Sequence, residues 1–352
     1  MRTAAKELHF PLAGVGRNLA VRVGNVPRED RAYYAPFAMN VRGVDPFEER
    51  LRGGSRPATL ELKGRSVGVE AVYMARRIYA DGALWFASRA GDVTDFDMGG
   101  DGEDPTRPAS GNAALSGRQG EAITALFTTD DGALYMATAN ALWVMRGDVT
   151  SGPFSLVSPT IGCVSQDAWA WDGVRLFVLS AQGVFAFSAG EPPRAVSESI
   201  PKELQDCTWA TMAYDKGLDA LNITSDKGNW TLEIGEGAWW PFDDSGKSKV
   251  AIGPFRTAGR DDEDGMLDTL MVALDRESTD VTVEAYSGKT AVEALYKAGN
   301  GGAQWSATAK AGFNNLTRPR LRGAWCVIVL RGTGAWAYEG MTATVKQLGR
   351  LR

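Results

Sequence analysis

The side chains that most often carry out catalysis are few in this sequence, and they are far apart. The single histidine, His9, lies near the start of the chain, and the three cysteines are Cys163, Cys207 and Cys326. A Ser-His-Asp or Cys-His nucleophile would have to use His9. A structural zinc site needs four nitrogen or sulfur ligands at short spacings. We therefore predict neither kind of site, and the odd, dispersed cysteines argue against a disulfide framework.

Acidic residues offer two further candidate chemistries. Asp95, Asp97 and the segment 101–104 carry several oxygens that could face Ca²⁺, but their spacing departs from that of an EF-hand. Segments 128–135 and 224–230 resemble the Asp-box of sialidases, which locks a β-turn. A retaining glycosidase needs two carboxyl groups about 5–5.5 Å apart, and no distinctive pair stands out. We expect a solvated acidic loop, no metal or cofactor, no catalytic residue, and a protein that is not an enzyme.

Short apolar runs bounded by turn residues dominate the chain and predict strands. Five of these runs follow a turn that contains Asp and Gly, because glycine supplies the positive φ that tight hairpins need. These turns are Asp81–Gly82, Asp131–Gly132, Asp172–Gly173, Asp215 with Gly217, and Asp264–Gly265. Repetition at about 40–50 residues, with about four strands per repeat, indicates a β-propeller. A β-sandwich with evenly spaced hairpins is the alternative, and only segments 199–205 and 291–297 predict short helices.

The repeat divides the chain into two predicted parts. Residues 66–352 are long enough for about six blades of about 45 residues, with five or seven as alternatives. Residues 1–65 are rich in arginine and lack the repeat, so we expect an extended arm that is ordered mainly by contact. The predicted fold is therefore all-β, a single β-propeller with an N-terminal arm.

The charge is divided in the same way. The whole chain has a formal net charge of −5, but residues 1–65 hold ten Arg and two Lys against seven acidic residues. An acidic body does not suit a nucleic-acid clamp, which needs clustered Lys and Arg. A basic arm on an acidic body instead predicts docking onto an acidic neighbour, including another copy of the chain. No apolar run approaches the roughly 18–20 residues of a membrane helix, and no signal peptide is recognisable, so we expect a soluble protein without membrane contacts.

The densest motif lies in the arm, at residues 40–57. It contains Asn40-Val41-Arg42 and then Arg50-Leu51-Arg52-Gly53-Gly54-Ser55-Arg56-Pro57. With segments 120–126, 142–148 and 161–169, and the closing segments 320–325 and 334–337, this arrangement resembles a family of tailed-bacteriophage virion proteins in which such an arm precedes a β-propeller. The resemblance covers most of the chain from about residue 35. It is also similar in plan to the nozzle or stabilisation components of short-tailed phages, which surround the DNA exit path and often form rings.

The resemblance implies a structural protein of the virion tail, nozzle-like or at the head-to-tail junction, made in the host cytoplasm. Its implied partners are copies of itself in a ring and other tail or head-to-tail proteins, with genome DNA only as non-specific passing cargo. The alternatives are a host-glycan-binding or sialidase-like propeller on the virion and a cellular protein-interaction propeller.

Within the motif, arginines around Gly53–Gly54 predict a flexible cationic loop. Guanidinium groups can pair with two carboxylate oxygens at once, so we predict an assembly interface there. Its residues are Arg42, Arg50, Arg52 and Arg56. The alternatives are a solvated loop whose arginines cap nearby carbonyl groups and, with weaker support, contact with DNA phosphates.

Overall fold

The computed structural model describes most of the chain from residue 68 onward and four short stretches before it. The described residues are 12–15, 33–35, 37–44, 51–55, 68–99, 103–112, 121–150, 152, 154–188, 191–198, 200–243, 245–259, 263–316 and 318–350. The chain forms two compact units: unit 1 contains residues 1–60 and 230–352, and unit 2 contains residues 61–229. This division differs from the predicted one, because the N-terminal segment groups with the C-terminal part of the chain.

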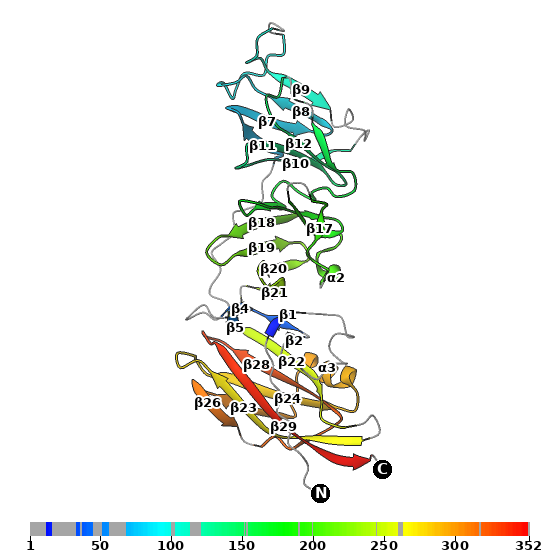
Figure 1. Cartoon of the computed structure of the whole chain (residues 1–352), viewed down its shortest axis with the longest axis vertical. Coiled ribbons are helices and arrows are strands. Elements are labelled where there is room, and N and C mark those ends of the chain that lie inside the picture. Colours follow the sequence, from blue (N-terminus) through cyan, green and yellow to red (C-terminus); the bar gives the residue numbers. More distant parts are fainter. Residues whose placement is uncertain are drawn as a thin grey trace. The chain divides into compact units, whose positions relative to one another are not determined.

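The described residues are almost entirely strands, which confirms the all-β prediction (Figure 1). Four successive antiparallel sheets each contain four strands in sequence order. They are β6 (Glu70–Tyr73), β7 (Arg76–Asp81), β8 (Leu84–Ala87) and β9 (Ala109–Asn112); β10 (Ile123–Thr129), β11 (Ala133–Thr138), β12 (Leu142–Met145) and β13 (Ser155–Ser158); β14 (Trp169–Trp171), β15 (Leu176–Ser180), β16 (Gly183–Phe187) and β17 (Arg194–Ala195); and β18 (Ala210–Asp215), β19 (Ala220–Ser225), β20 (Gly228–Glu233) and β21 (Ala238–Phe242). The boundary between the two units falls inside β20.

Four of the five predicted Asp-Gly turns join consecutive strands of these sheets. Gly82, Gly132 and Gly173 have positive φ angles of 58°, 72° and 100°, which is the conformation that favours glycine. Gly217 lies in the turn between β18 and β19, where its N–H donates to Asp215 Oδ1 at 3.0 Å.

The sheets of unit 2 pack against one another through apolar faces and the first strands. Ile78, Trp85, Leu126 and Met136 belong to one buried cluster that spans the first two sheets. Strand β6 contacts β10, and β14 contacts β18. The Phe127 ring stacks on Trp169 with centroids 4.3 Å apart, which connects the second and third sheets. Each sheet therefore buries one face on the next, as a two-layer packing requires.

Unit 1 has a different topology after Phe242. One sheet has the order β25-β24-β28-β22-β3, and in the other β23 pairs with β26, β27 and β29. Their bounds are β3 (Ala38–Met39), β22 (Ser248–Arg256), β23 (Glu263–Leu274), β24 (Val281–Gly288), β25 (Trp305–Ala309), β26 (Gly312–Leu316), β27 (Leu321–Arg322), β28 (Trp325–Gly332) and β29 (Tyr338–Arg350). Residues from both sheets share one buried core, so unit 1 is a two-sheet sandwich rather than a continuation of the meander.

The fifth predicted turn is wrong for this reason. Asp264 and Gly265 lie inside β23, where they pair with Gly349 and Gln347 of β29. The partner strand lies some 80 residues further along the chain, so local turn chemistry could not reveal it. The sequential four-strand repeat therefore stops after β21 among the described residues.

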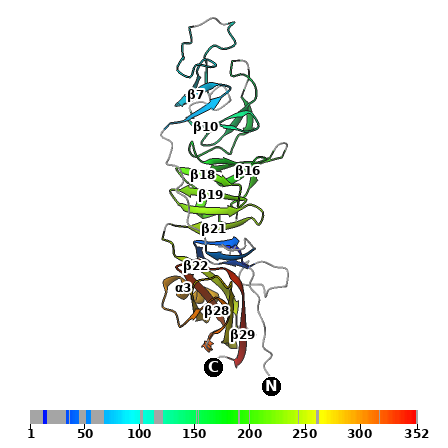
Figure 2. The same cartoon turned by 90° about the vertical axis from the view of Figure 1, so that its left-hand side faces the viewer.

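Two short helices lie where they were predicted. Helix α2 is Pro201–Leu204, and α3 is Ala291–Asn300. The Thr290 hydroxyl accepts from Glu293 N at 3.1 Å and so caps the start of α3. Ala294 and Ala298 are buried with Tyr286 and Val327, on the face of the five-stranded sheet that turns away from the shared core. Figure 2 shows α3 and β29 on opposite sides of unit 1. Within the described part of the chain, no helix is long and apolar enough to cross a membrane.

Candidate assembly site

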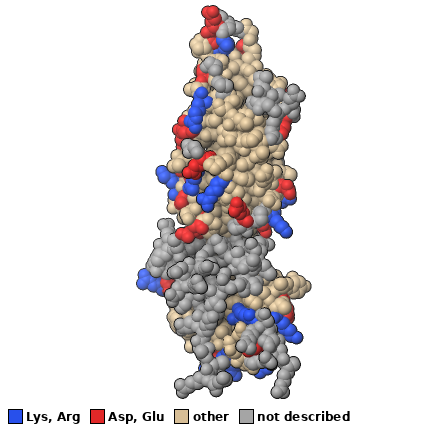
Figure 3. Space-filling model, turned by 45° about the vertical axis from the view of Figure 1, so that its right-hand side comes forward, with Lys and Arg blue, Asp and Glu red and all other residues tan. Residues whose placement is uncertain are grey.

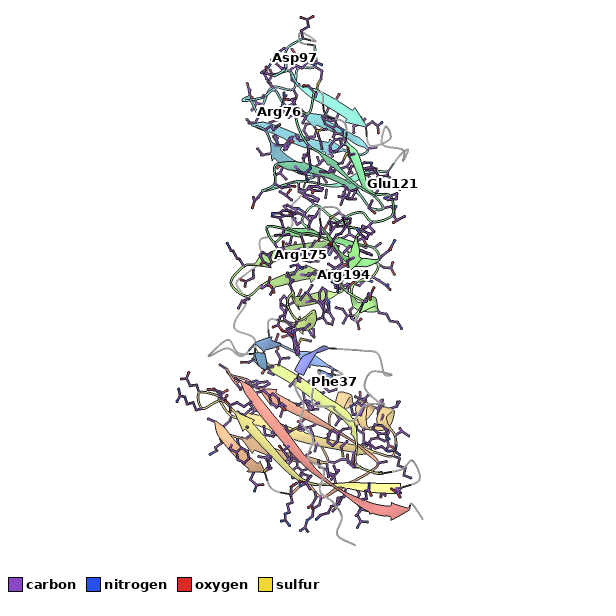
Figure 4. All side chains as sticks on the ribbon, in the orientation of Figure 1. Phe37, Arg76, Asp97, Glu121, Arg175 and Arg194 are labelled. Atoms are coloured by element: carbon purple, nitrogen blue, oxygen red, sulfur yellow. The ribbon has the colours of Figure 1, made fainter. Side chains whose placement is uncertain are left out.

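The N-terminal segment is built into unit 1 through main-chain pairing. Strand β3 lies at the edge of the five-stranded sheet, with Met39 opposite Lys249 and Ala38 opposite Val250. Just before it, Phe37 O accepts from Ala251 N at 2.9 Å. The Lys249 ammonium lies 4.5 Å from the centroid of the Phe37 ring, which Figure 4 labels. The described part of the segment thus adds a strand to the edge of a sheet.

Among the described residues of this segment, Asn40 makes several hydrogen bonds to the 243–247 region. Its Nδ2 donates to Asp243 Oδ1 at 2.6 Å and to Lys247 O at 2.9 Å, and its Oδ1 accepts from Asp243 N at 2.8 Å. The side chain is 6% exposed, and the residue has a φ of 53°. Asparagine tolerates this left-handed conformation better than most residues. A single amide therefore fixes both the backbone turn and the 243–247 loop.

The acceptor of that bond is itself organised. The Ser245 hydroxyl donates to Asp243 Oδ1 at 2.6 Å, and Ser245 N donates to the same oxygen at 2.9 Å. The Ser245 hydroxyl above all, and then the Asn40 amide, hold the pKa of Asp243 below its usual value. The carboxylate is thus ionised and aimed at Asn40 near neutral pH.

The second attachment uses the glycine-serine end of the motif. Strands β4 (Val41–Val44) and β5 (Leu51–Ser55) form an antiparallel pair with Val41 opposite Ser55. Ser55 N donates to Trp336 O at 2.8 Å, and the Ser55 hydroxyl accepts from Trp336 N at 3.0 Å. Buried Gly54 pairs with Arg42 on one side and bridges Ala337 on the other, and glycine permits such close approach of two backbones. The hairpin is therefore held at its open end, by Asn40 just before β4 and by Ser55 at the end of β5.

Trp336 is the apolar base under this attachment. It is completely buried, and its Nε1 donates to Ser248 Oγ at 2.6 Å. The Ser248 hydroxyl donates in turn to Gly332 O at 3.2 Å. The indole position is therefore fixed by contacts that do not involve the hairpin.

The predicted interface arginines are only partly placed by the structure. Arg42 lies in β4 and Arg52 in β5, whereas Arg50 and Arg56 lie outside the described residues. The prediction of a flexible loop around Gly53–Gly54 is wrong, because both glycines lie in strand β5 and Gly54 bridges the distant Ala337. The residues that anchor the hairpin, Asn40 and Ser55, stand inside the quoted motif, yet their partners some 200 to 280 positions later carry no local signal.

In the acidic loop at residues 92–107, Asp95 and Asp104 pair with the guanidinium of Arg89 instead of forming an open set of metal ligands. Arg89 Nε donates to Asp95 Oδ2 at 2.6 Å, and its Nη1 pairs with Asp104. The Thr106 hydroxyl and N–H, and then Arg89, lower the pKa of Asp104 to about 2. Asp97 Oδ1 accepts from Gly99 N at 2.9 Å, and Figure 4 shows Asp97 at the far end of this loop. A search of the described residues finds no group of three His, Cys, Asp or Glu that could hold a metal ion.

Arg76 supports the same loop from below. Its guanidinium is completely buried and donates to the carbonyl oxygens of Ser88, Pro105, Thr106 and Arg107 at 2.7–3.1 Å. A buried guanidinium that meets main-chain carbonyls from two distant segments closes the loop, so its role is structural.

Other candidate groups for chemistry are also engaged in structure. Asp172 Oδ1 accepts from Val174 N and Arg175 N at 2.8 and 2.6 Å, and Arg146 donates to Asp131 at 2.7 Å. All three cysteines are buried, and burial raises the pKa of Cys163 and of Cys326 to about 12. These carboxylates cap turns, and these thiols are buried.

The surface charge of unit 2 is mixed. On the face shown in Figure 3, Lys and Arg alternate with Asp and Glu over the described residues, without a continuous basic patch on that face. Interspersed charges of both signs give weak attraction for a nucleic-acid backbone.

Comparisons with known proteins give little further guidance. No protein-family profile matches the chain, and no curated protein matches it. One similar solved structure is the crystal structure of the mitotic checkpoint complex, with a TM-score of 0.30 and 7% identity over 64% of this chain and 55% of that one. Another is PorZ, described as a surface component of the type-IX secretion system of Porphyromonas gingivalis, with a TM-score of 0.32 and 14% identity over 61% of this chain and 27% of that one. The chain thus spans about half and about a quarter of these two proteins, and likeness at this level carries no argument about function.

Proposed function

We propose that this chain is a non-enzymatic structural protein of a tailed-bacteriophage virion, a nozzle-like or head-to-tail tail component that assembles with copies of itself. The observation that carries the proposal is the docked N-terminal hairpin. Asn40 and Ser55, which belong to the motif with the phage resemblance, are the residues that attach this hairpin to unit 1. A motif whose residues hold a docked segment suits a structural protein that functions by assembling.

The engagement of the candidate chemical groups supports the same proposal. The acids of the tight turns and of the 92–107 loop accept hydrogen bonds within their own turns or pair with Arg89, and the thiols are buried. We further propose that the meander sheets are propeller-type blades. In two of the three pairs of successive sheets the first strands lie beside each other, β6 with β10 and β14 with β18, as the inner strands of blades do.

The proposed role toward DNA is passive. The described surface has charges of both signs, and the chain has a net charge of −5, so the genome would slide past rather than adhere. The arginines Arg42, Arg50, Arg52 and Arg56 remain the proposed contacts with neighbouring subunits or tail proteins.

Sedimentation velocity of the purified full chain, from low to high micromolar concentration, tests the proposal. We expect a discrete higher oligomer whose population grows with concentration, and weakening when the four arginines are replaced by glutamine. A chain in which Arg77 and Arg146, both exposed on unit 2, are replaced by glutamine is the matched control and should assemble normally. A strictly monomeric protein, tight duplex binding with a steep salt dependence, or hydrolysis in a glycan screen would count against it.

A further inference from the structure

The core of unit 1 includes residues of the N-terminal segment. We call the described residues 37–44 and 51–55 the arm, and we call β22, the 243–247 loop and Trp336 the acceptor. Ala38 and Val41 of the arm are 6% and 2% exposed, and they share one buried cluster with Val250 and Trp336 of the acceptor. The apolar face of the acceptor is therefore complete only when an arm covers it.

Every described attachment of the arm to the acceptor is non-covalent. The attachments include the β3–β22 pairing, the Asn40 bonds to Asp243 and Lys247, and the Ser55 bonds to Trp336. Each uses groups that any copy of the chain presents in the same geometry. The acceptor has no means of distinguishing its own arm from the arm of another copy.

The arm is also far from its acceptor along the chain. Residues 61–229 fold as a separate compact unit between them. Arm and acceptor are thus two binding partners tethered by a folded unit, and their pairing within one chain or between chains depends on effective concentration. When the arm reaches a neighbouring copy, the exchange is either reciprocal, which closes a dimer, or head-to-tail, which closes a ring when the rotation allows.

We propose that copies of this chain exchange arms in the assembled state, so that the arm of one copy occupies the acceptor of its neighbour. The partner is a second copy of this chain, and the mode is addition of a strand to an open sheet edge. This inference rests on the proposed self-assembly and names the contact that would produce it.

A disulfide between chains tests the exchange. Ala38 and Val250 are directly opposite each other in the β3–β22 register, at a separation that suits a disulfide. One full-length chain carries Ala38→Cys, and a differently sized tagged chain carries Val250→Cys. The two are mixed, concentrated into the assembled state, oxidised and separated without reductant. Because mixing is random, about half of the Ala38→Cys chains should form the mixed dimer if the arms are exchanged.

Two controls make the result decisive. A single chain with both substitutions, kept dilute, should form an intramolecular disulfide, which shows that the pair can form and that the variant folds. Pairing Ala38→Cys with Val174→Cys, an exposed position on unit 2, should give only background dimer.

The outcomes separate the two proposals. A mixed dimer at about half yield supports exchange. Normal assembly with a disulfide only in the doubly substituted chain overturns exchange and leaves the proposed function standing. Failure of the unsubstituted chain to assemble at any concentration overturns both.

Discussion

Removal of the Asn40 side-chain amide should destabilise unit 1 far more than removal of an exposed asparagine amide in the same unit. The residue makes two neutral hydrogen bonds, to Lys247 O and from Asp243 N, and one to the charged Asp243 carboxylate. Neutral bonds contribute about 0.5–1.5 kcal/mol each, and a bond to a charged group contributes about 1.5–3 kcal/mol. The lost bonds therefore total about 4 kcal/mol for Asn40→Ala. The φ of 53° adds about 1 kcal/mol, because alanine tolerates it poorly.

Two matched variants separate these contributions. Asn40→Gly loses the same hydrogen bonds but fits the positive φ, so it should be the milder substitution by about 1 kcal/mol. Asn315→Ala changes an exposed asparagine on β26 of the same unit and should lie within about 0.5 kcal/mol of the unsubstituted protein.

The assay is urea unfolding followed by tryptophan fluorescence and circular dichroism, with the transition of unit 1 fitted separately from that of unit 2. Trp240 and Trp336, both buried in unit 1, report on the relevant transition. The reasoning is refuted if Asn40→Ala costs less than about 1 kcal/mol, or if it unfolds like Asn315→Ala.

Three further predictions concern unit 2 and the thiols. Arg76→Met should cost about 3–5 kcal/mol in the unfolding free energy of unit 2, because it leaves four carbonyl groups without their donor. Arg77→Met loses an exposed ion pair and should cost less than about 1 kcal/mol. Equal costs would contradict the buried role of Arg76. The lowered pKa of Asp104, about 2, means that its stabilising contribution is present above the unfolded value of about 4 and is lost as pH falls from 4 through 2. The hydrogen-exchange protection of the described residues of the 92–107 loop, corrected for the intrinsic pH dependence of amide exchange, should therefore fall over that interval, and unchanged protection at pH 2 would disprove the pairing. Finally, a thiol reagent at pH 8 should leave the native protein unlabelled, because its cysteines Cys163, Cys207 and Cys326 are buried, and should label all three in urea. Rapid labelling of the native protein would contradict their burial.

Local sequence chemistry predicted the hairpins well, because their partners are close in the sequence. Asp131 and Asp172 lie next to the turns that they cap, and both flanking strands lie within a few residues. The same holds for α3, because its capping residue Thr290 and its buried alanines lie within one short stretch of sequence. Asp264–Gly265 has the same local sequence, but it lies inside strand β23, whose partner β29 comes some 80 residues later.

The arm shows the same limit at longer range. Its composition predicts that it is ordered mainly by contact, and its described residues make contacts with a distant part of the same chain. The pairing of Gly54 with Ala337 and of Asn40 with Asp243 depends on segments some 200 to 280 positions away. Motif chemistry singled out residues 40–57 but assigned Gly53–Gly54 to a flexible loop. A glycine pair indicates flexibility only when no second backbone lies beside it, and Ala337 lies beside Gly54.

Quantitative mass spectrometry of purified particles, released by cells that make this chain, tests the central claim most directly. The account predicts peptides of this chain in intact, DNA-containing virions, at a fixed number of copies greater than one per particle and at a ratio typical of a ring in the tail. Absence of the chain from such particles, while it accumulates in the cell, would contradict the account.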